Sequence, residues 1–220
     1  SNHLPANGLA VNLVTAVFAR AGYQIDMQFM PWQRVAEGLS NGDVDLSVAS
    51  WHSPTRAQEA LYTAPYLTNE LVIVKRKLDL LNFTNNQEFK DYVSQKSYRL
   101  GVFKEFGYGE QFDEIAPLVS LNYYKYCKSM LRDVATKSTD IALIDHWTAE
   151  NSLLKSKNIA DHLEVIPTPL ISRSLHTTIS LKRNDRDIIA SAFNQALKEM
   201  KDDGSYDKIL THHNYPQLAK

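Results

Sequence analysis

The sequence predicts an α/β fold of two lobes, hinged over a cleft. The first observation is that helical and strand-like periods of apolar residues alternate, and that this series occurs twice along the chain. The second is a pair of extended stretches near residues 74–78 and 167–174, which would connect the two series. The third is the length of 220 residues, enough for two lobes of roughly 100 residues each. Lobe one is expected to comprise residues 1–74 and 175–220, and lobe two residues 75–174.

The first elements follow from the spacing of apolar residues. Apolar side chains at helical spacing predict a helix over residues 10–21, and Gly22 is suited to end it. Strict alternation predicts a strand at 23–29 with one buried face. A helix that opens with a proline is expected over 31–41 and should bury Trp32.

The remaining elements are predicted by the same two periods. Strands are expected at residues 44–49, 71–74, 100–102, 119–123, 141–144 and 175–181. Helices are expected around residues 89–93, 112–115, 126–134 and 188–200. The segment 165–170 contains two prolines and has no period, so we expect a crossover connection there.

Composition and charge exclude several classes of protein. The 44% hydrophobic and 22% charged fractions are typical of a soluble globular chain, and no apolar run approaches the roughly 20 residues that cross a bilayer. A net charge of −1 predicts no nucleic-acid partner, and we interpret Lys75-Arg76-Lys77 as the solvated end of a strand. Cys127 is the single cysteine and should be an inert side chain on an apolar helix stripe. The histidines are scattered, so we expect no metal site and no cofactor.

The clearest functional signal is an arginine that ends a turn directly after a strand. Ser50-Trp51-His52-Ser53-Pro54-Thr55-Arg56 follows the strand at 44–49, and Trp51 breaks its alternation, which favours an exposed ring. A guanidinium suits a carboxylate because it can donate two parallel hydrogen bonds. The motif therefore predicts capture of a small anion or zwitterion. The alternative is a surface ion pair between Arg56 and Glu59.

Several segments, in order, resemble the bacterial type 2 periplasmic solute-binding proteins. The branch most similar is that of the polar amino-acid-binding proteins, family 3 of the extracellular solute-binding proteins, and the resemblance runs from about residue 8 to 213. The segments are GLAVNLV from Gly8, PWQR from Pro31, GDVD from Gly42, SPTR from Ser53, YTAPY from Tyr62 and DGSYDKIL from Asp203.

The resemblance implies a set of ligand-binding residues. Arg56 would pair with the ligand carboxylate, and Asp145 would receive its amino group, unless Asp145 serves only as the N-cap of the next helix. Trp51 or Tyr66 would stack on the ligand, and the turn at residues 106–108 would offer backbone N–H groups. The full set is Arg56, Asp145, Ser53, Trp51, Tyr66, Phe106, Gly107 and Tyr108. The chain departs from the family at three places: Trp51 replaces a frequent serine, Glu105 replaces a frequent glycine, and the usual first strand has no counterpart before Gly8.

The resemblance also implies a function. It implies a periplasmic, monomeric binding protein whose signal peptide has been removed, although the residues alone fit either a removed signal peptide or none. Such a protein closes its lobes on a small carboxylate-bearing solute, such as an amino acid, for the permease of an ABC transporter. One alternative is the sensing domain of a membrane receptor such as a histidine kinase or cyclase. Another is an enzyme similar to the cyclohexadienyl dehydratases, with Glu105 or His146 as acid or base. No nucleophile and base set is present, so we expect no catalysis.

Overall fold

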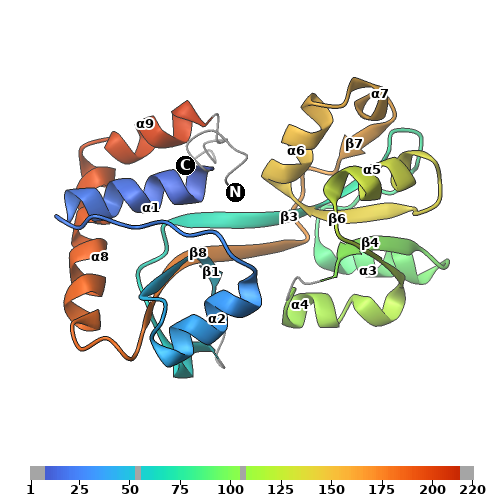
Figure 1. Ribbon diagram of the computed structural model, residues 1–220. Helices are drawn as coiled ribbons and strands as arrows, with labels where there is room; N and C mark the ends of the chain where they lie inside the picture. The colour runs from blue at the N-terminus through green and yellow to red at the C-terminus, as the bar shows by residue number, and fades with distance from the viewer. Residues whose placement is uncertain (1–7, 53–55, 105–107, 214–220) are drawn as a thin grey trace. The chain divides into compact units, whose positions relative to one another are not determined.

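The computed structural model describes residues 8–52, 56–104 and 108–213 (Figure 1). The chain divides into two compact units: unit 1 is Ser1–Thr68 with Arg173–Lys220, and unit 2 is Asn69–Ser172. Both divisions fall inside long strands, β3 (Leu67–Arg76) and β8 (Ile171–Ser180). The lobe boundaries expected from the sequence lie in the same two strands, a few residues further along.

Unit 2 contains a mixed sheet in the order β3-β6-β4-β5, with β7 also paired to β3. β3 pairs antiparallel with β6 and β7, whereas β4 pairs parallel with both β5 and β6. The strands are β4 (Arg99–Phe103), β5 (Ser120–Tyr124), β6 (Ile141–Asp145) and β7 (Leu163–Val165). The helices are α3 (Asn86–Ser94), α4 (Glu110–Asp113), α5 (Cys127–Ala135), α6 (His146–Leu154) and α7 (Lys157–Ala160), with the 3-10 turn η3 (Ala116–Leu118).

The core of unit 2 forms where α5 and α6 pack on the sheet (Figure 1). Met130 and Val134 of α5 are fully buried together with Val72 of β3 and Ile144 of β6. Each such side chain contributes about 1.5 to 3 kcal/mol through its burial. Cys127 is partly buried against this cluster, and burial raises the pKa of its thiol. The expectation of an inert cysteine on an apolar stripe agrees with this position.

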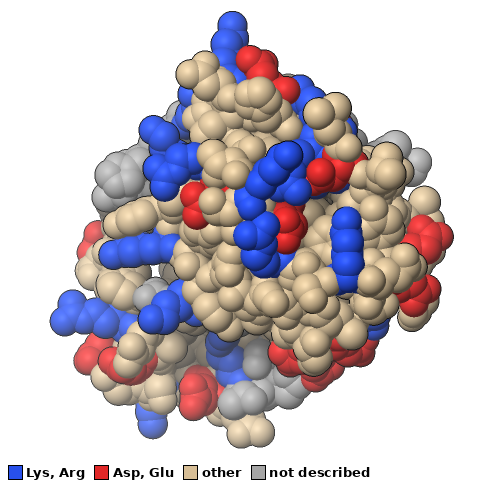
Figure 2. Space-filling view, turned by 90° about the vertical axis from the view of Figure 1, so that its right-hand side faces the viewer, with Lys and Arg blue, Asp and Glu red and all other residues tan. Residues whose placement is uncertain are grey.

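The surface carries charges of both signs. Figure 2 shows Lys and Arg side chains interspersed with Asp and Glu across one face. This mixture agrees with the net charge of −1. Within the residues that the structure describes, no helix is long and apolar enough to cross a membrane.

Unit 1 builds a smaller antiparallel sheet around β8. β1 (Leu46–Trp51) and β2 (Ala60–Tyr62) both pair with β8, and Trp51 lies opposite Leu175. The register of β1 shifts between Ser47 and Ser50, and Ala49 within this bulge has a left-handed φ of 61°. Because a bulge bends its strand, it sets the direction in which the Trp51 end of β1 leaves the sheet.

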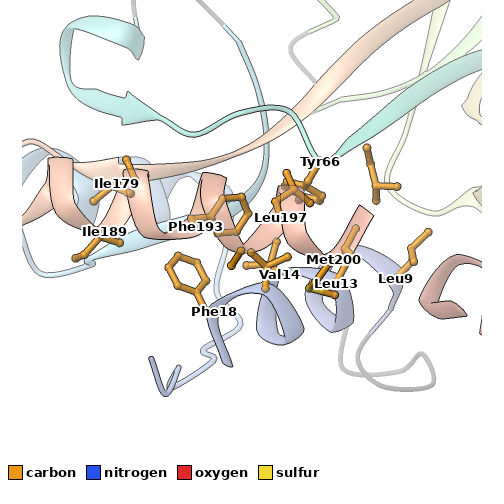
Figure 3. Close-up of a cluster of buried hydrophobic side chains, with 14 of the residues drawn as sticks. Leu9, Leu13, Val14, Phe18, Tyr66, Ile179, Ile189, Phe193, Leu197 and Met200 are labelled. Atoms are coloured by element: carbon orange, nitrogen blue, oxygen red, sulfur yellow. The ribbon is translucent and has the colours of Figure 1, made fainter. Parts of the chain in front are cut away.

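The core of unit 1 lies between helices from opposite ends of the chain (Figure 3). α1 (Leu9–Arg20) contacts α8 (Arg186–Asp202) and α9 (Ser205–His212), and the rings of Phe18 and Phe193 lie 5.0 Å apart. α2 (Trp32–Asn41) contacts β1 and ends at Gly42, whose φ of 92° is left-handed as a helix-ending glycine requires. The helices predicted at both ends of the chain are therefore confirmed.

The strand predicted at residues 23–29 is wrong. This segment pairs with no strand among the described residues. Its side chains still alternate: Tyr23 and Ile25 pack against the unit 1 core, while Gln24 and Asp26 are exposed. Alternation reports only that one side of an extended segment faces apolar surface. A strand also needs a neighbouring backbone with which to exchange hydrogen bonds.

Tertiary contacts override the local pattern at two further places, Trp32 and Lys75, whereas Lys77 is exposed just after β3, as expected for the Lys75-Arg76-Lys77 triple. Trp32 is 39% exposed at the start of α2, where Gly38 and Leu39 take the buried positions. Lys75 is buried, not solvated, and its ammonium group forms an ion pair with Glu164 and donates to the Asp79 carbonyl at 2.7 Å. These partners replace the water that an ammonium group loses on burial.

Candidate functional site

Arg56 lies at the start of the 3-10 turn η2 (Arg56–Gln58) and is half-buried. One terminal nitrogen, Nη1, donates to the Trp51 carbonyl at 3.2 Å. The Cζ atom is 4.9 Å from the centroid of the Trp32 ring, a cation–π arrangement. The alternative ion pair with Glu59 is not found within the described part of the chain. The guanidinium is thus held by a carbonyl and a ring.

Trp51 is the last residue of β1 and is half-buried. Its carbonyl accepts hydrogen bonds from Arg56 and from the Tyr62 hydroxyl, each at 3.2 Å. Its ring lies 5.4 Å from Cζ of Arg173 on β8. The bulge at Ala49 precedes it by two residues, so β1 is bent where its indole leaves the strand. The prediction of an exposed ring is correct only in part.

Tyr66 has a structural position in the core of unit 1. It is 1% exposed and belongs to the cluster that Figure 3 shows. Its hydroxyl accepts the Ala49 N–H at 2.9 Å, and burial raises the pKa of the phenol. The Tyr206 hydroxyl donates to its carbonyl at 2.7 Å. Its contacts support the bulge in β1, and its ring is covered by the core.

Asp145 ends β6 in unit 2 and is the N-cap of α6. One carboxylate oxygen, Oδ1, accepts from the backbone N–H and the hydroxyl of Thr148, both at 2.7 Å. The other, Oδ2, accepts from the side-chain amide of Asn69. The capping role that the sequence left open is therefore present. Oδ1 already accepts two hydrogen bonds, whereas Oδ2 accepts one and has a second lone pair, so these contacts fix a carboxylate that can accept one more donor at Oδ2.

Tyr108 supports the sheet of unit 2. Its hydroxyl accepts the Phe103 N–H at 2.8 Å, and its ring centroid lies 4.6 Å from that of Phe112. It is 5% exposed, and this burial raises the pKa of the phenol to about 12. The predicted residues Ser53, Phe106 and Gly107, and also Glu105, lie outside the described residues.

Sequence reasoning missed the residues that surround Trp51 from β2 and β8. The rings of His52 and Tyr62 are 4.9 Å apart, and those of Tyr62 and His176 are 5.5 Å apart. Nδ1 of His176 lies 2.8 Å from the Thr63 carbonyl, so it carries the proton and donates it there. No sequence motif indicates that Arg173 or His176 lies near the candidate site. The antiparallel pairing of β1 and β2 with β8 brings Arg173 to the Trp51 ring and His176 to the Tyr62 ring.

His146, the alternative acid or base, lies between two carboxylates of unit 2. Nδ1 lies 3.6 Å from a Glu70 oxygen, and Nε2 lies 3.2 Å from a Glu150 oxygen one turn along α6. Within residues 8–52, 56–104 and 108–213, no three His, Cys, Asp or Glu side chains form a group that could hold a metal ion. The geometry of His146 is that of a bridge between β3 and α6.

Comparisons with known proteins agree on one family. A model of the bacterial extracellular solute-binding proteins, family 3, matches residues 2–215. The arginine-binding extracellular protein ArtP of Bacillus subtilis (strain 168) is 24% identical over 206 residues, which span 92% of this chain and 75% of that protein.

Two solved structures are similar in fold. An ancestral arginine-binding protein bound to arginine has a TM-score of 0.73 at 17% identity, covering 93% of this chain and 87% of that one. An ancestral amino-acid-binding protein, a precursor of cyclohexadienyl dehydratase, has a TM-score of 0.71 at 18% identity, covering 93% and 84%. These likenesses confirm the two-lobed α/β fold of type 2 periplasmic binding proteins. Because the family model matches nearly every residue, the chain belongs to family 3 of the bacterial extracellular solute-binding proteins.

Proposed function

We propose that this protein captures an amino acid, or a closely related solute, by its carboxylate and presents it to the permease of an ABC transporter in the periplasm. The observation that carries the proposal is the placement of Arg56. Its guanidinium is held by the Trp51 carbonyl and the Trp32 ring, and no carboxylate neutralises it within the described residues. A fixed, unneutralised guanidinium is suited to a ligand carboxylate.

The contacts of Arg56 support tight binding for a physical reason. A free arginine side chain loses conformational freedom when it binds, which costs about 0.5 to 1.5 kcal/mol. The Trp51 carbonyl engages Nη1, and the Trp32 ring lies 4.9 Å from the Cζ atom. Much of the side chain's freedom is therefore removed before a ligand arrives. The guanidinium has five N–H donors, so one bond to Trp51 leaves enough for a bidentate carboxylate pair.

We assign a second role to Asp145, whose carboxylate is oriented by Asn69 and Thr148. In this role it accepts the ligand ammonium group with a remaining lone pair. The names of the relatives support an amino acid as ligand, since one is an arginine-binding protein and another a probable histidine-binding protein. We further propose that the protein acts as a monomer, and that it acts without catalysis, which the match to a family of solute-binding proteins supports.

Calorimetric titration of Arg56→Gln tests the proposal. Native mass spectrometry of the purified protein first identifies a retained amino acid, and the titration then uses that compound. We expect the variant to bind about 30-fold to several thousand-fold more weakly, because truncation removes a buried charge partner worth about 2 to 5 kcal/mol. Lysine at position 56 should restore only part of the affinity, since an ammonium group lacks the planar fork.

The matched control is Arg132→Gln. Arg132 is an exposed arginine in unit 2 whose ion-pair contact, to Asp133 at 3.6 Å, is with its sequence neighbour. This variant should bind like the wild type. Affinities of Arg56→Gln and wild type that agree within about threefold, with both proteins folded, would show that Arg56 does not anchor the ligand.

A further inference from the structure

A second arginine lies at the same tryptophan that holds Arg56. The ring centroid of Trp51 is 5.4 Å from Cζ of Arg173, and the carbonyl of Trp51 is 3.2 Å from Nη1 of Arg56. All three residues belong to unit 1 and are half-buried. Arg173 reaches this position because Trp51 lies opposite Leu175 in the pairing of β1 with β8. Trp51 therefore has the guanidinium of Arg173 at its ring and that of Arg56 at its carbonyl.

The two guanidinium groups differ from those of Arg20 and Arg183, two other arginines of unit 1. Arg20 is paired with Asp203, and Arg183 is paired with both Asp45 and Asp185. For Arg56 and Arg173, by contrast, the described part of the chain offers only the tryptophan contacts and no carboxylate. Two like charges at one residue repel each other, and a ring face compensates a cation only weakly. A ligand that brings negative charge to both groups would relieve this repulsion.

We propose that unit 1 recognises a ligand with two anionic groups, such as an acidic amino acid, with Arg56 binding the α-carboxylate and Arg173 the second carboxylate. The inference rests on the proposed function, because it takes the role of Arg56 from there. It also sets this chain apart from relatives named for arginine or histidine. A cationic ligand side chain placed at Trp51 would meet the positive charge of Arg173 and be disfavoured.

The experiment is a calorimetric titration of the full chain, freed of any retained ligand, with glutamate, aspartate, succinate, glutamine and arginine. We expect glutamate or aspartate to bind at least about 30-fold more tightly than glutamine or arginine, because glutamine and arginine lack a second carboxylate. Arg173→Gln should bind glutamate and aspartate about 30-fold more weakly than wild type, which removes about this whole difference. The affinity of the same variant for glutamine should stay within about threefold of wild type.

Two variants serve as references in the same titration. Arg56→Gln should weaken acidic and neutral amino acids alike, since both present an α-carboxylate. Arg183→Gln removes a positive charge from the same unit, but from an arginine already paired with Asp45 and Asp185, so all affinities should stay within about threefold. Circular dichroism confirms that each variant is folded.

Four results would overturn the inference. The first is that glutamine or arginine binds wild type as tightly as glutamate does. The second is that Arg173→Gln lowers the affinities for glutamate and glutamine equally. Either result leaves the proposed function standing, provided that Arg56→Gln weakens binding by about 30-fold or more. If none of the compounds binds wild type, or Arg56→Gln leaves every affinity unchanged, the proposed function itself is wrong and the inference falls with it.

Discussion

Ala49 is a single residue whose backbone conformation affects the candidate site. Its φ of 61° lies in the left-handed region, which an alanine adopts at a cost of about 1 kcal/mol. The Tyr66 hydroxyl accepts its N–H at 2.9 Å and holds the bulge in place. The strained residue stands two positions before Trp51, on which both guanidinium groups converge. Local strain and candidate binding geometry are therefore joined in one short stretch of β1.

The backbone of Ala49 leads to a prediction about stability. Ala49→Gly should stabilise the fold by about 0.5 to 1 kcal/mol, because glycine adopts a positive φ without the clash of a Cβ atom. The measurement is urea unfolding followed by circular dichroism. The control is Ala60→Gly in β2, where the residue is buried and φ is not positive. This control should lower the free energy of unfolding by about 1 kcal/mol or more. An equal loss of stability in both variants would contradict the account of the bulge.

Among the elements, β4 and β6 are joined by a charged contact as well as by their parallel ladder. The backbone N–H of Arg99 and its Nε both donate to Asp140 Oδ2, at 2.9 and 3.0 Å, and Nη2 donates to Oδ1 at 2.9 Å. Burial by itself would raise the pKa of Asp140, but the hydrogen bonds and charge of Arg99 outweigh it and lower that pKa below its usual value. The carboxylate form of Asp140 is therefore the one that stabilises the pairing of β4 with β6.

The direction of this shift predicts a dependence on pH. A carboxyl whose pKa is lower in the folded state stabilises the fold above its unfolded pKa of about 3.9 and loses this effect as the pH falls through the folded value. Asp140→Asn should therefore lower the free energy of unfolding at pH 7 by about 1 to 2 kcal/mol, a modest figure because Arg99 is partly exposed. Below about pH 4 the difference from wild type should shrink.

The measurement for Asp140→Asn is urea unfolding at pH 7, 5 and 3.5. Asp161→Asn is the control, since Asp161 is exposed and no ion pair of it is found among the described residues. It should change the free energy of unfolding by less than about 0.5 kcal/mol at each pH. A difference between Asp140→Asn and wild type that grows toward acid pH would contradict the assignment.

At the scale of the whole molecule, the chain forms one continuous and one discontinuous unit. Unit 2 is the single segment Asn69–Ser172, whereas unit 1 needs both ends of the chain. Unit 2 has its own cluster of buried residues around Met130 and Ile144. A continuous segment with its own core can in principle fold alone, whereas either part of unit 1 by itself lacks half of its core.

We therefore expect a fragment of residues 69–172 to fold by itself. It should show the circular dichroism of a mixed α/β protein and one cooperative thermal transition, at a lower temperature than the full chain. A fragment of residues 69–140, which lacks β6, should stay unfolded because the sheet order places β6 between β3 and β4. Absence of a cooperative transition in the longer fragment would show that unit 2 depends on unit 1.

Local physics explains what could be predicted from the sequence. The helices α1, α2 and α8 and the buried strand β6 are confirmed, since apolar spacing and helix-ending glycines act over a few residues. Order and spacing of short motifs also sufficed to identify the family that the full-length match confirms. The candidate role of Arg56 came from the same source, a turn directly after a strand.

The tertiary structure decided everything that depends on pairing between distant segments. Residues 23–29 alternate like a strand but have no strand partner among the described residues. Trp32 lies on an apolar stripe of the sequence, yet its side chain stays partly exposed and its ring lies against Arg56. Arg173 comes to Trp51 only because β8 pairs with β1 across more than half the chain. Periodicity records which side of an element is apolar. Which element covers that side, and which charges meet there, is determined by contacts that no local pattern encodes.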